Sequence, residues 1–143
     1  MFYKTPEFDA DLSAWNVENV TNMDSLFYGA AKFNANIANW NTSSLRSLFN
    51  TFTDAQSFNY SLGRWNSKLE GESSLANCGM GVANYDRTIE GWRNNPLNSS
   101  LSNIKVTANK LLYRNAKTKR QELIDLRTWK FEEDREADKA LVI

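Results

Sequence analysis

The chain contains almost the same nine residues three times, and this repetition constrains its fold more than any other feature. The copies are FDADLSAWN at residues 8–16, FNANIANWN at 33–41 and FNYSLGRWN at 58–66, so each follows the last by 25 residues. A unit of this length cannot bury its apolar face alone, and neighbouring units must therefore stack. The repeat predicts a core in which equivalent side chains of successive units touch.

The apolar positions of the repeat form three columns. They hold Phe8, Phe33 and Phe58, then Leu12, Ile37 and Leu62, then Trp15, Trp40 and Trp65. We expect the tryptophan column to be core, with a sugar-stacking platform as the alternative. Because Phe2 lies 25 residues before Phe27, we also expect the chain to begin inside a repeat and earlier repeats to precede it.

Each unit also has a predicted internal structure. Helical spacing is shown by Met23, Leu26, Phe27 and Ala30. Thr21 or Asn22 can cap such a helix, and Gly29 lies near its end. Residues 13–20 alternate apolar with polar side chains, which is typical of a short strand or an extended segment. The predicted fold class is therefore α/β: a short leucine-rich-repeat-like solenoid of 25-residue coils over residues 1–83, with about three coils and the first incomplete.

Residues 84–143 read as a C-terminal α+β capping segment, because a solenoid exposes a raw apolar end unless something covers it. A helix beginning near Asn84 would place Tyr85, Ile89 and Trp92 on one face. Two short extended pieces are expected within residues 104–113, a second helix within 115–129 and a last strand at 129–131. Leu123, Ile124 and the pair Leu126 and Arg127 are predicted to lie near the apolar side of the second helix.

The polar columns leave two interpretations open. Asp9, Asn34 and Asn59 could face a ligand, as could the asparagine that follows each tryptophan (Asn16, Asn41 and Asn66). The alternative is an asparagine ladder, in which these side chains satisfy turn backbone groups in each coil. Asp9 and Asp11 together suggest calcium. The acidic charge is lost in the next two copies, so we expect the ladder and no metal.

Composition removes several kinds of chemistry. Histidine is absent and Cys78 is the single cysteine, which excludes the usual zinc sites, intrachain disulfides and Ser-His-Asp or Cys-His pairs. We expect Cys78 to be a buried structural thiol. The basic run at residues 117–121 is expected to be a solvated helix face, with phosphate contact as the alternative. Lys plus Arg and Asp plus Glu both total 17, so no nucleic-acid partner is expected.

A family resemblance follows from these residues. FDADLSAWNVENVTNMDSLFYGA followed by FNANIANWN resembles the BspA-type surface-protein repeat, approximately Phe-Asn-x-Asp-Ile-Ser-x-Trp-Asp-x-Ser-x-Val-Thr-x-Met-x-x-Met-Phe. NCGMGVANYDRTIEGW and RQELIDLRTWKF resemble the segment that closes such arrays in exported bacterial proteins. The resemblance implies a leucine-rich-repeat-like protein of the cell surface or secreted space. It carries no catalytic residues.

The expected function is therefore a non-enzymatic binding or adhesion module with a protein or glycan ligand, no cofactor, no membrane insertion and unknown ligand-binding residues. The start MFYKTPEF is not a signal peptide, so surface location implies a fragment or mature form. One alternative is a structural component of a larger assembly, a virion or fibre subunit or homo-oligomer docking through an open N-terminal coil. An enzyme using Asp9 and Asp11 is a third, but the repeat already explains their spacing.

Overall fold

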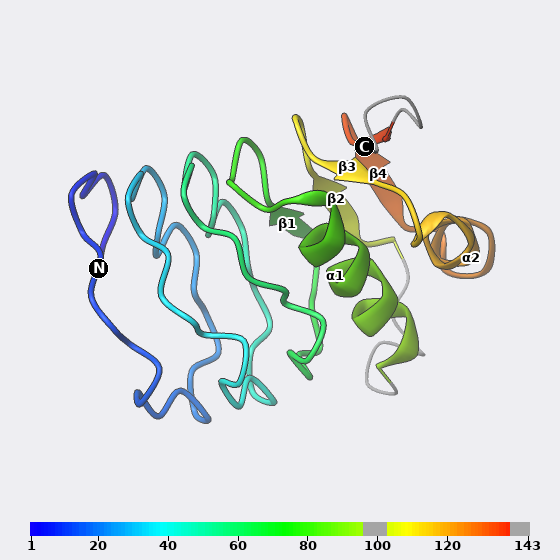
Figure 1. Ribbon diagram of the computed structural model, residues 1–143. Coiled ribbons are helices and arrows are strands. Elements are labelled where there is room, and N and C mark those ends of the chain that lie inside the picture. The colour runs from blue at the N-terminus through cyan, green and yellow to red at the C-terminus, as the bar shows by residue number, and fades with distance from the viewer. Residues whose placement is uncertain (96–102, 138–143) are drawn as a thin grey trace.

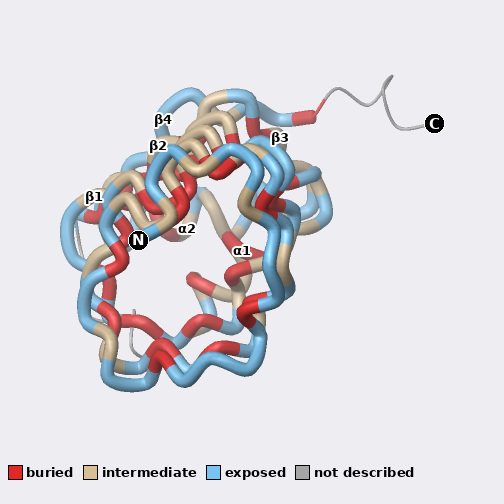
Figure 2. Tube along the Cα trace, turned by 90° about the vertical axis from the view of Figure 1, so that its left-hand side faces the viewer, coloured by how far each residue is buried: buried red, intermediate tan, exposed pale blue. Residues whose placement is uncertain are grey.

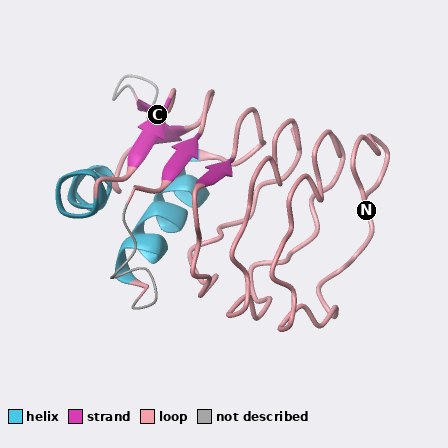
Figure 3. Ribbon diagram, turned by 180° about the vertical axis from the view of Figure 1, so that it is seen from behind, coloured by secondary structure: helices cyan, strands magenta, loops and turns pink. Residues whose placement is uncertain are grey.

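The computed structural model describes residues 1–95 and 103–137 and shows successive turns of the chain lying side by side (Figure 1). Within these residues the elements are β1 (Glu72–Ser74), α1 (Val82–Asn94), β2 (Lys105–Thr107), β3 (Leu112–Tyr113), α2 (Lys117–Arg127), β4 (Lys130–Glu132) and β5 (Arg135–Glu136). All of them lie toward the C-terminal end (Figure 3).

The predicted fold class is wrong. Each predicted coil contains an extended piece and a short helix, whereas residues 1–71, all of them described, contain turns and extended backbone without a named helix or strand. The protein is a small mixed α/β domain, with two helices and small sheets of short strands in the part of the chain that the structure describes. The division into residues 1–83 and 84–143 stays a prediction.

Backbone geometry explains why the predicted helix at residues 23–30 does not form. An α-helix needs negative φ throughout, but Ser25 has φ 56° and Gly29 has φ 68°. Of the two possibilities for residues 13–20, the strand is wrong, because local turns take its hydrogen bonds. The Trp15 amide donates to the Leu12 carbonyl at 3.0 Å within one of these turns.

Side chains 25 residues apart nevertheless stack in register. The ring centroids of Phe8 and Phe33 are 5.8 Å apart, and those of Phe33 and Phe58 are 5.9 Å apart. Phe27 and Phe52 form a parallel column at 5.7 Å. Buried positions recur in successive turns (Figure 2) and join one hydrophobic cluster that continues into the helical end.

The tryptophan column is only partly core. The indole Nε1 of Trp40 donates to the Leu12 carbonyl at 3.0 Å, and that of Trp65 donates to the Ile37 carbonyl at 3.0 Å. Each of these buried indoles therefore ties its own turn to the preceding one. The core prediction is wrong for Trp15, which is 45% exposed. Trp15 belongs to the first of the three repeat units in the sequence.

Among the described residues, the strands of both sheets pair in parallel only. β1, β2 and β4 form one sheet in that order, and β3 pairs with β5. Single bridges from Asn22 to Ser47 and from Leu48 to Ser73 extend the same parallel pairing toward the N-terminus. On the sheet surface Lys105 lies between Glu132, at 3.2 Å, and Glu72, at 3.7 Å.

The elements predicted after residue 83 are confirmed with small shifts at their ends. α1 begins at Val82 rather than Asn84, and its buried face contains the three predicted residues Tyr85, Ile89 and Trp92. α2, β2, β3 and β4 fall in the predicted segments. Leu123 of α2 is buried, but Leu126 is 69% exposed, so its predicted apolar role is wrong. The physical reason is position: α2 is at the outer end of the molecule (Figure 1).

A buried carboxylate joins the two helices. Asp86 of α1 is 4% exposed and accepts hydrogen bonds from the amides of Arg114, Asn115 and Ala116, at 2.8, 2.9 and 3.1 Å. These amides precede α2, whose own N-cap residue, Ala116, makes no side-chain capping bond. Asp86 therefore supplies from α1 the acceptor and negative charge that a helix start favours.

A second buried contact closes the helical end. The Asp134 carboxylate accepts the Tyr85 hydroxyl at 2.7 Å and two guanidinium bonds from Arg120, at 2.9 and 2.7 Å. The Arg120 guanidinium also lies over the rings of Tyr113 and Phe131, at 4.7 and 5.0 Å. Burial, together with the Asp134 charge, raises the pKa of Tyr85 well above its usual value, so the phenol stays a hydrogen-bond donor.

Candidate functional site

An open hollow of about 530 Å³ lies where the outer face of α1 meets the second and third copies of the nine-residue unit. We call it the α1 groove. The repeat units contribute polar side chains that include Asn36, Asn39, Tyr60 and Arg64. α1 contributes Asn84, Arg87, Glu90 and Asn94. The groove is therefore built from two parts of the chain with different sequence patterns.

The repeat positions that line the groove are those at which the copies differ. Tyr60 occupies the position of Ala10 and Ala35 in the earlier copies. Arg64 occupies the position of Ala14 and Asn39. The constant Phe and Leu/Ile columns point instead into the core. These departures from the repeat were the sequence signal for the groove, and reasoning from the repeat's constant columns missed them.

On α1 the groove residues follow helical spacing. Asn84, Arg87, Gly91 and Asn94 recur every three or four residues, and they share a face opposite the buried one. Sequence analysis identified the buried face and did not assign the outer one. The amphipathic pattern of residues 82–94 defines the buried face and the polar outer face together, so the sequence could have predicted the outer face as well.

Two glycines bring α1 directly onto the third unit. A Cβ built at Gly91 would lie 2.1 Å from the Gly63 carbonyl oxygen, and one built at Gly63 would lie 2.2 Å from the Arg87 carbonyl oxygen. Only glycine allows backbone to approach backbone this closely. The distance between the two walls of the groove is thus set by main chain and not by movable side chains.

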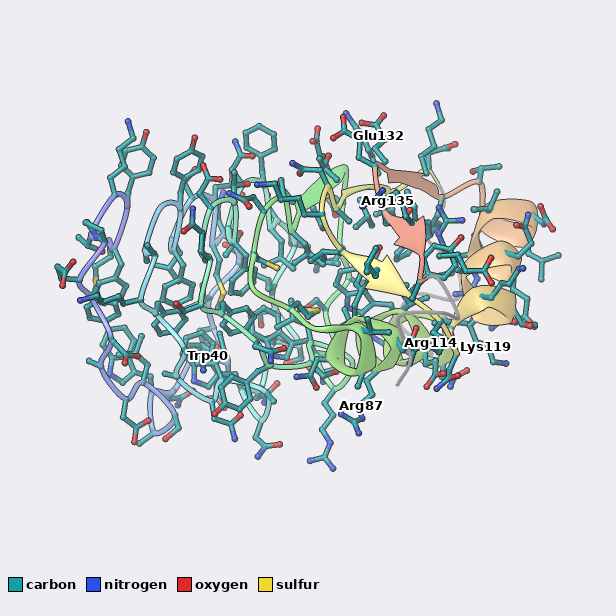
Figure 4. The ribbon with its side chains drawn as sticks, turned by 45° about the horizontal axis from the view of Figure 1, so that its top comes forward. Trp40, Arg87, Arg114, Lys119, Glu132 and Arg135 are labelled. Carbon is teal, nitrogen blue, oxygen red and sulfur yellow. The ribbon has the colours of Figure 1, made fainter. Side chains whose placement is uncertain are left out.

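The groove holds three charged side chains without a charged partner. The Arg64 Nη1 donates to Asn39 Oδ1 at 3.0 Å, and the Arg87 Nη1 donates to Asn84 Oδ1 at 3.1 Å. Among the described residues neither guanidinium forms an ion pair, and neither does Glu90. Figure 4 shows Arg87 extending from α1 away from the body of the molecule. These groups remain available to an incoming ligand.

The basic run on α2 differs in this respect. Lys117 pairs with Glu136 at 3.0 Å, Lys119 with Glu122 at 3.7 Å and Arg120 with Asp134 at 2.7 Å. All three cations already have carboxylate partners. These ion pairs engage the cations of the run within the protein, and the phosphate-contact alternative gains no support.

The predicted ladder is confirmed. Asp9 Oδ1 accepts the Asn34 amide at 3.2 Å, Asn34 Oδ1 accepts the Asn59 amide at 2.9 Å, and Asn59 Oδ1 accepts the Gly81 amide at 2.8 Å. Asp11 accepts the Ser13 amide at 2.9 Å, and hydrogen bonding by Ser13 lowers the pKa of Asp11. Within residues 1–95 and 103–137 no three His, Cys, Asp or Glu side chains are grouped to hold a metal ion.

Cys78 is buried, as predicted. Burial raises the pKa of its thiol to about 11, so the thiol stays protonated near neutral pH. Of the helices in the described segments, none combines the length and the apolar character needed to span a bilayer.

Comparison with known proteins identifies the family and nothing closer. No curated protein and no solved structure matches the chain significantly. One family model, described as "Mycoplasma protein of unknown function, DUF285", matches residues 1–92. The match includes all three repeat units and most of α1, and its description does not name BspA-type proteins. Because it covers more than half of the 143 residues, the chain belongs to the DUF285 family.

Proposed function

We propose that this protein is a non-enzymatic binding module of a bacterial surface or secreted protein, related to BspA-type repeats, and that its ligand binds in the α1 groove. One observation carries the proposal. The groove gathers the variable positions of the repeat and the polar face of α1, and it leaves Arg64, Arg87 and Glu90 without charged partners. Hollows lined by a few polar and charged groups that can still bind a ligand are typical of recognition sites.

The residues of the groove support binding rather than catalysis. Acid–base chemistry commonly uses two carboxylates facing each other across a bound substrate. Among the described residues that line the groove, Glu90 is the single carboxylate. Asp9 and Asp11 lie in a different hollow, and each accepts a backbone amide.

A binding panel tests the proposal. The chain is immobilised and exposed to extracellular-matrix proteins and to a glycan array, beside the double variant Arg64→Ala/Arg87→Ala. We expect at least one ligand to bind, and the double variant to bind it about tenfold or more weakly, because charge-assisted hydrogen bonds are lost. Arg46→Ala, an exposed arginine outside the groove, is the matched control. Unchanged binding by the double variant, or chemical conversion of the ligand, would contradict the proposal.

A second candidate function, assembly between copies of the chain, is favoured by the first turn. Trp15 and Tyr3 are 45% and 51% exposed, and Phe2 of the same turn stacks on Phe27 at 5.8 Å. We propose that this face receives the same face of a second copy, so that like rings meet as they do within the chain. Light scattering should then give a dimer mass that Trp15→Ser reduces to a monomer. A monomer at all concentrations would rule the candidate out.

A further inference from the structure

We propose that the ligand of the α1 groove is an acidic glycan: an oligosaccharide that carries sparse carboxylate or sulfate groups among neutral sugars. This inference rests on the proposed binding function and specifies the ligand for the same site. Three features of the groove support it, namely its guanidinium groups, its amide and phenol groups, and its single carboxylate.

The guanidinium groups define the charged part of the ligand. Arg64 and Arg87 each use one nitrogen to bind a neighbouring asparagine, at 3.0 and 3.1 Å. This bond orients each side chain and leaves further N–H donors of its planar fork unused. Such a fork matches the two oxygens of a carboxylate or a sulfate ester. The groove is therefore prepared for an oxyanion by groups that no carboxylate within the described residues neutralises.

The remaining lining suits sugars better than peptides. Asn36 and Asn94 present amides, and Tyr60 presents a half-buried phenol whose ring lies 6.3 Å from that of Phe58. Amides bind hydroxyl groups, and an aromatic ring can pack against the C–H face of a sugar. Peptides generally dock on an exposed strand edge or into apolar pockets. Among the described residues of the groove, none belongs to a strand and Ala38 is the largest aliphatic side chain.

Glu90 limits how much negative charge the ligand can bring. It lies one helical turn after Arg87 and lines the same groove. A densely charged polyanion would place further negative groups near this carboxylate and be repelled. A glycan with occasional acid groups would satisfy both guanidiniums while its neutral hydroxyl groups donate to Glu90.

The test is a titration of the full chain, followed by amide NMR shifts. The probes are a glucuronate-containing tetrasaccharide, the same tetrasaccharide with its carboxyl groups reduced to alcohols, a sulfated tetrasaccharide and an acidic peptide of equal charge. We expect one or both acidic sugars to shift amides around residues 36–39, 60–64 and 84–94. The two acidic sugars distinguish carboxylate from sulfate. The reduced sugar should bind about tenfold or more weakly.

Variants with opposite expected signs guard against simple unfolding. Arg87→Ala should weaken binding of the acidic sugar about tenfold. It should change the weak binding of the reduced sugar by no more than about twofold. Glu90→Gln should strengthen binding of the acidic sugar about two- to fivefold, because it removes a carboxylate that repels the acid groups of the sugar. Arg46→Ala should change neither. An unfolded variant cannot give the gain expected of Glu90→Gln.

Several results would overturn the inference. Equal binding of the reduced and acidic sugars in the groove would show that the ligand need not be acidic, while the proposed binding function would stand. Stronger binding of the acidic peptide would show that the ligand is a peptide and not a glycan, and the proposed binding function would again stand. Shifts confined to other surfaces, or no binding by any probe, would overturn the glycan. If the wider binding panel also failed, the proposed function would fall with it.

Discussion

Replacing Asp86 should separate the two helices, because one buried carboxylate satisfies three backbone amides ahead of α2. In Asp86→Ala these donors lose their acceptor. Ala116 is fully buried, so its amide cannot be rehydrated, whereas Asn115 is exposed and its amide can bind water. A buried donor without a partner costs about 1–3 kcal/mol, and loss of a charged acceptor adds to this. Counting Ala116 in full and Arg114 in part gives a loss of about 3–4 kcal/mol.

The assay is urea unfolding followed by tryptophan fluorescence, with hydrogen exchange to locate the change. A loss of this size should lower the melting temperature by about 10 °C. Asp86→Asn keeps the shape and one acceptor oxygen, so it should lose about half as much free energy. Exchange should accelerate first at the amides of residues 114–116.

A control separates the buried contact from loss of negative charge. Asp125 is an exposed carboxylate on α2 that accepts a bond from Gln121 at 2.8 Å. Asp125→Ala should change stability by less than about 0.5 kcal/mol. If Asp86→Ala cost under about 1 kcal/mol, or if its exchange pattern equalled that of the Asp125 variant, the role assigned to Asp86 would be refuted.

Three further predictions concern the same end of the molecule. Gly91→Ala should lower the free energy of unfolding by about 2–3 kcal/mol despite better helix propensity, since its Cβ would lie 2.1 Å from the Gly63 carbonyl oxygen. Gly81→Ala, whose Cβ would have its nearest contact at 3.6 Å, should change that free energy by less than about 1 kcal/mol. Equal denaturation midpoints for the two variants would contradict the close approach of the two glycines. Asp134→Asn should cost about 3 kcal/mol by leaving the Arg120 charge without its partner, and Tyr85→Phe about 1 kcal/mol; a Tyr85→Phe loss exceeding that of Asp134→Asn would reverse the ranking. Cys78 should resist thiol reagents at pH 8 as long as the protein is folded, and rapid labelling of the folded protein would contradict its burial. Its contribution to stability should fall as pH rises from about 9 toward about 11, because the thiol ionises in the unfolded chain before it does in the folded one. Cys78→Ala should flatten that decline in stability.

The sequence predicted contacts better than it predicted regular elements. The 25-residue interval correctly brings Phe33 beside Phe58 and lets Asn34 bind Asn59, since equivalent residues of successive turns meet whatever the backbone between them does. It could not show that Ser25 takes a left-handed conformation, because serine is not confined to that region. The predicted helix failed at this residue.

The candidate site was missed for a related reason. Reasoning from a repeat weights its constant positions, and those positions build the core. Tyr60 and Arg64 are departures from the repeat, and their meaning depends on α1 lying against them. That approach depends on Gly63 and Gly91 meeting, which no local pattern in either segment predicts.

The exclusively parallel pairing of strands affects how this protein reaches its native state. Each pair joins segments far apart in sequence, such as Glu72 with Lys105 and Lys105 with Lys130, and hairpins are absent from the described sheets. No strand can gain a partner until the chain has closed a loop of more than twenty residues. Folding should therefore be slow for a domain of this size. During synthesis, the ribosome must release the whole of the next turn before the preceding turn can form its strand pairs.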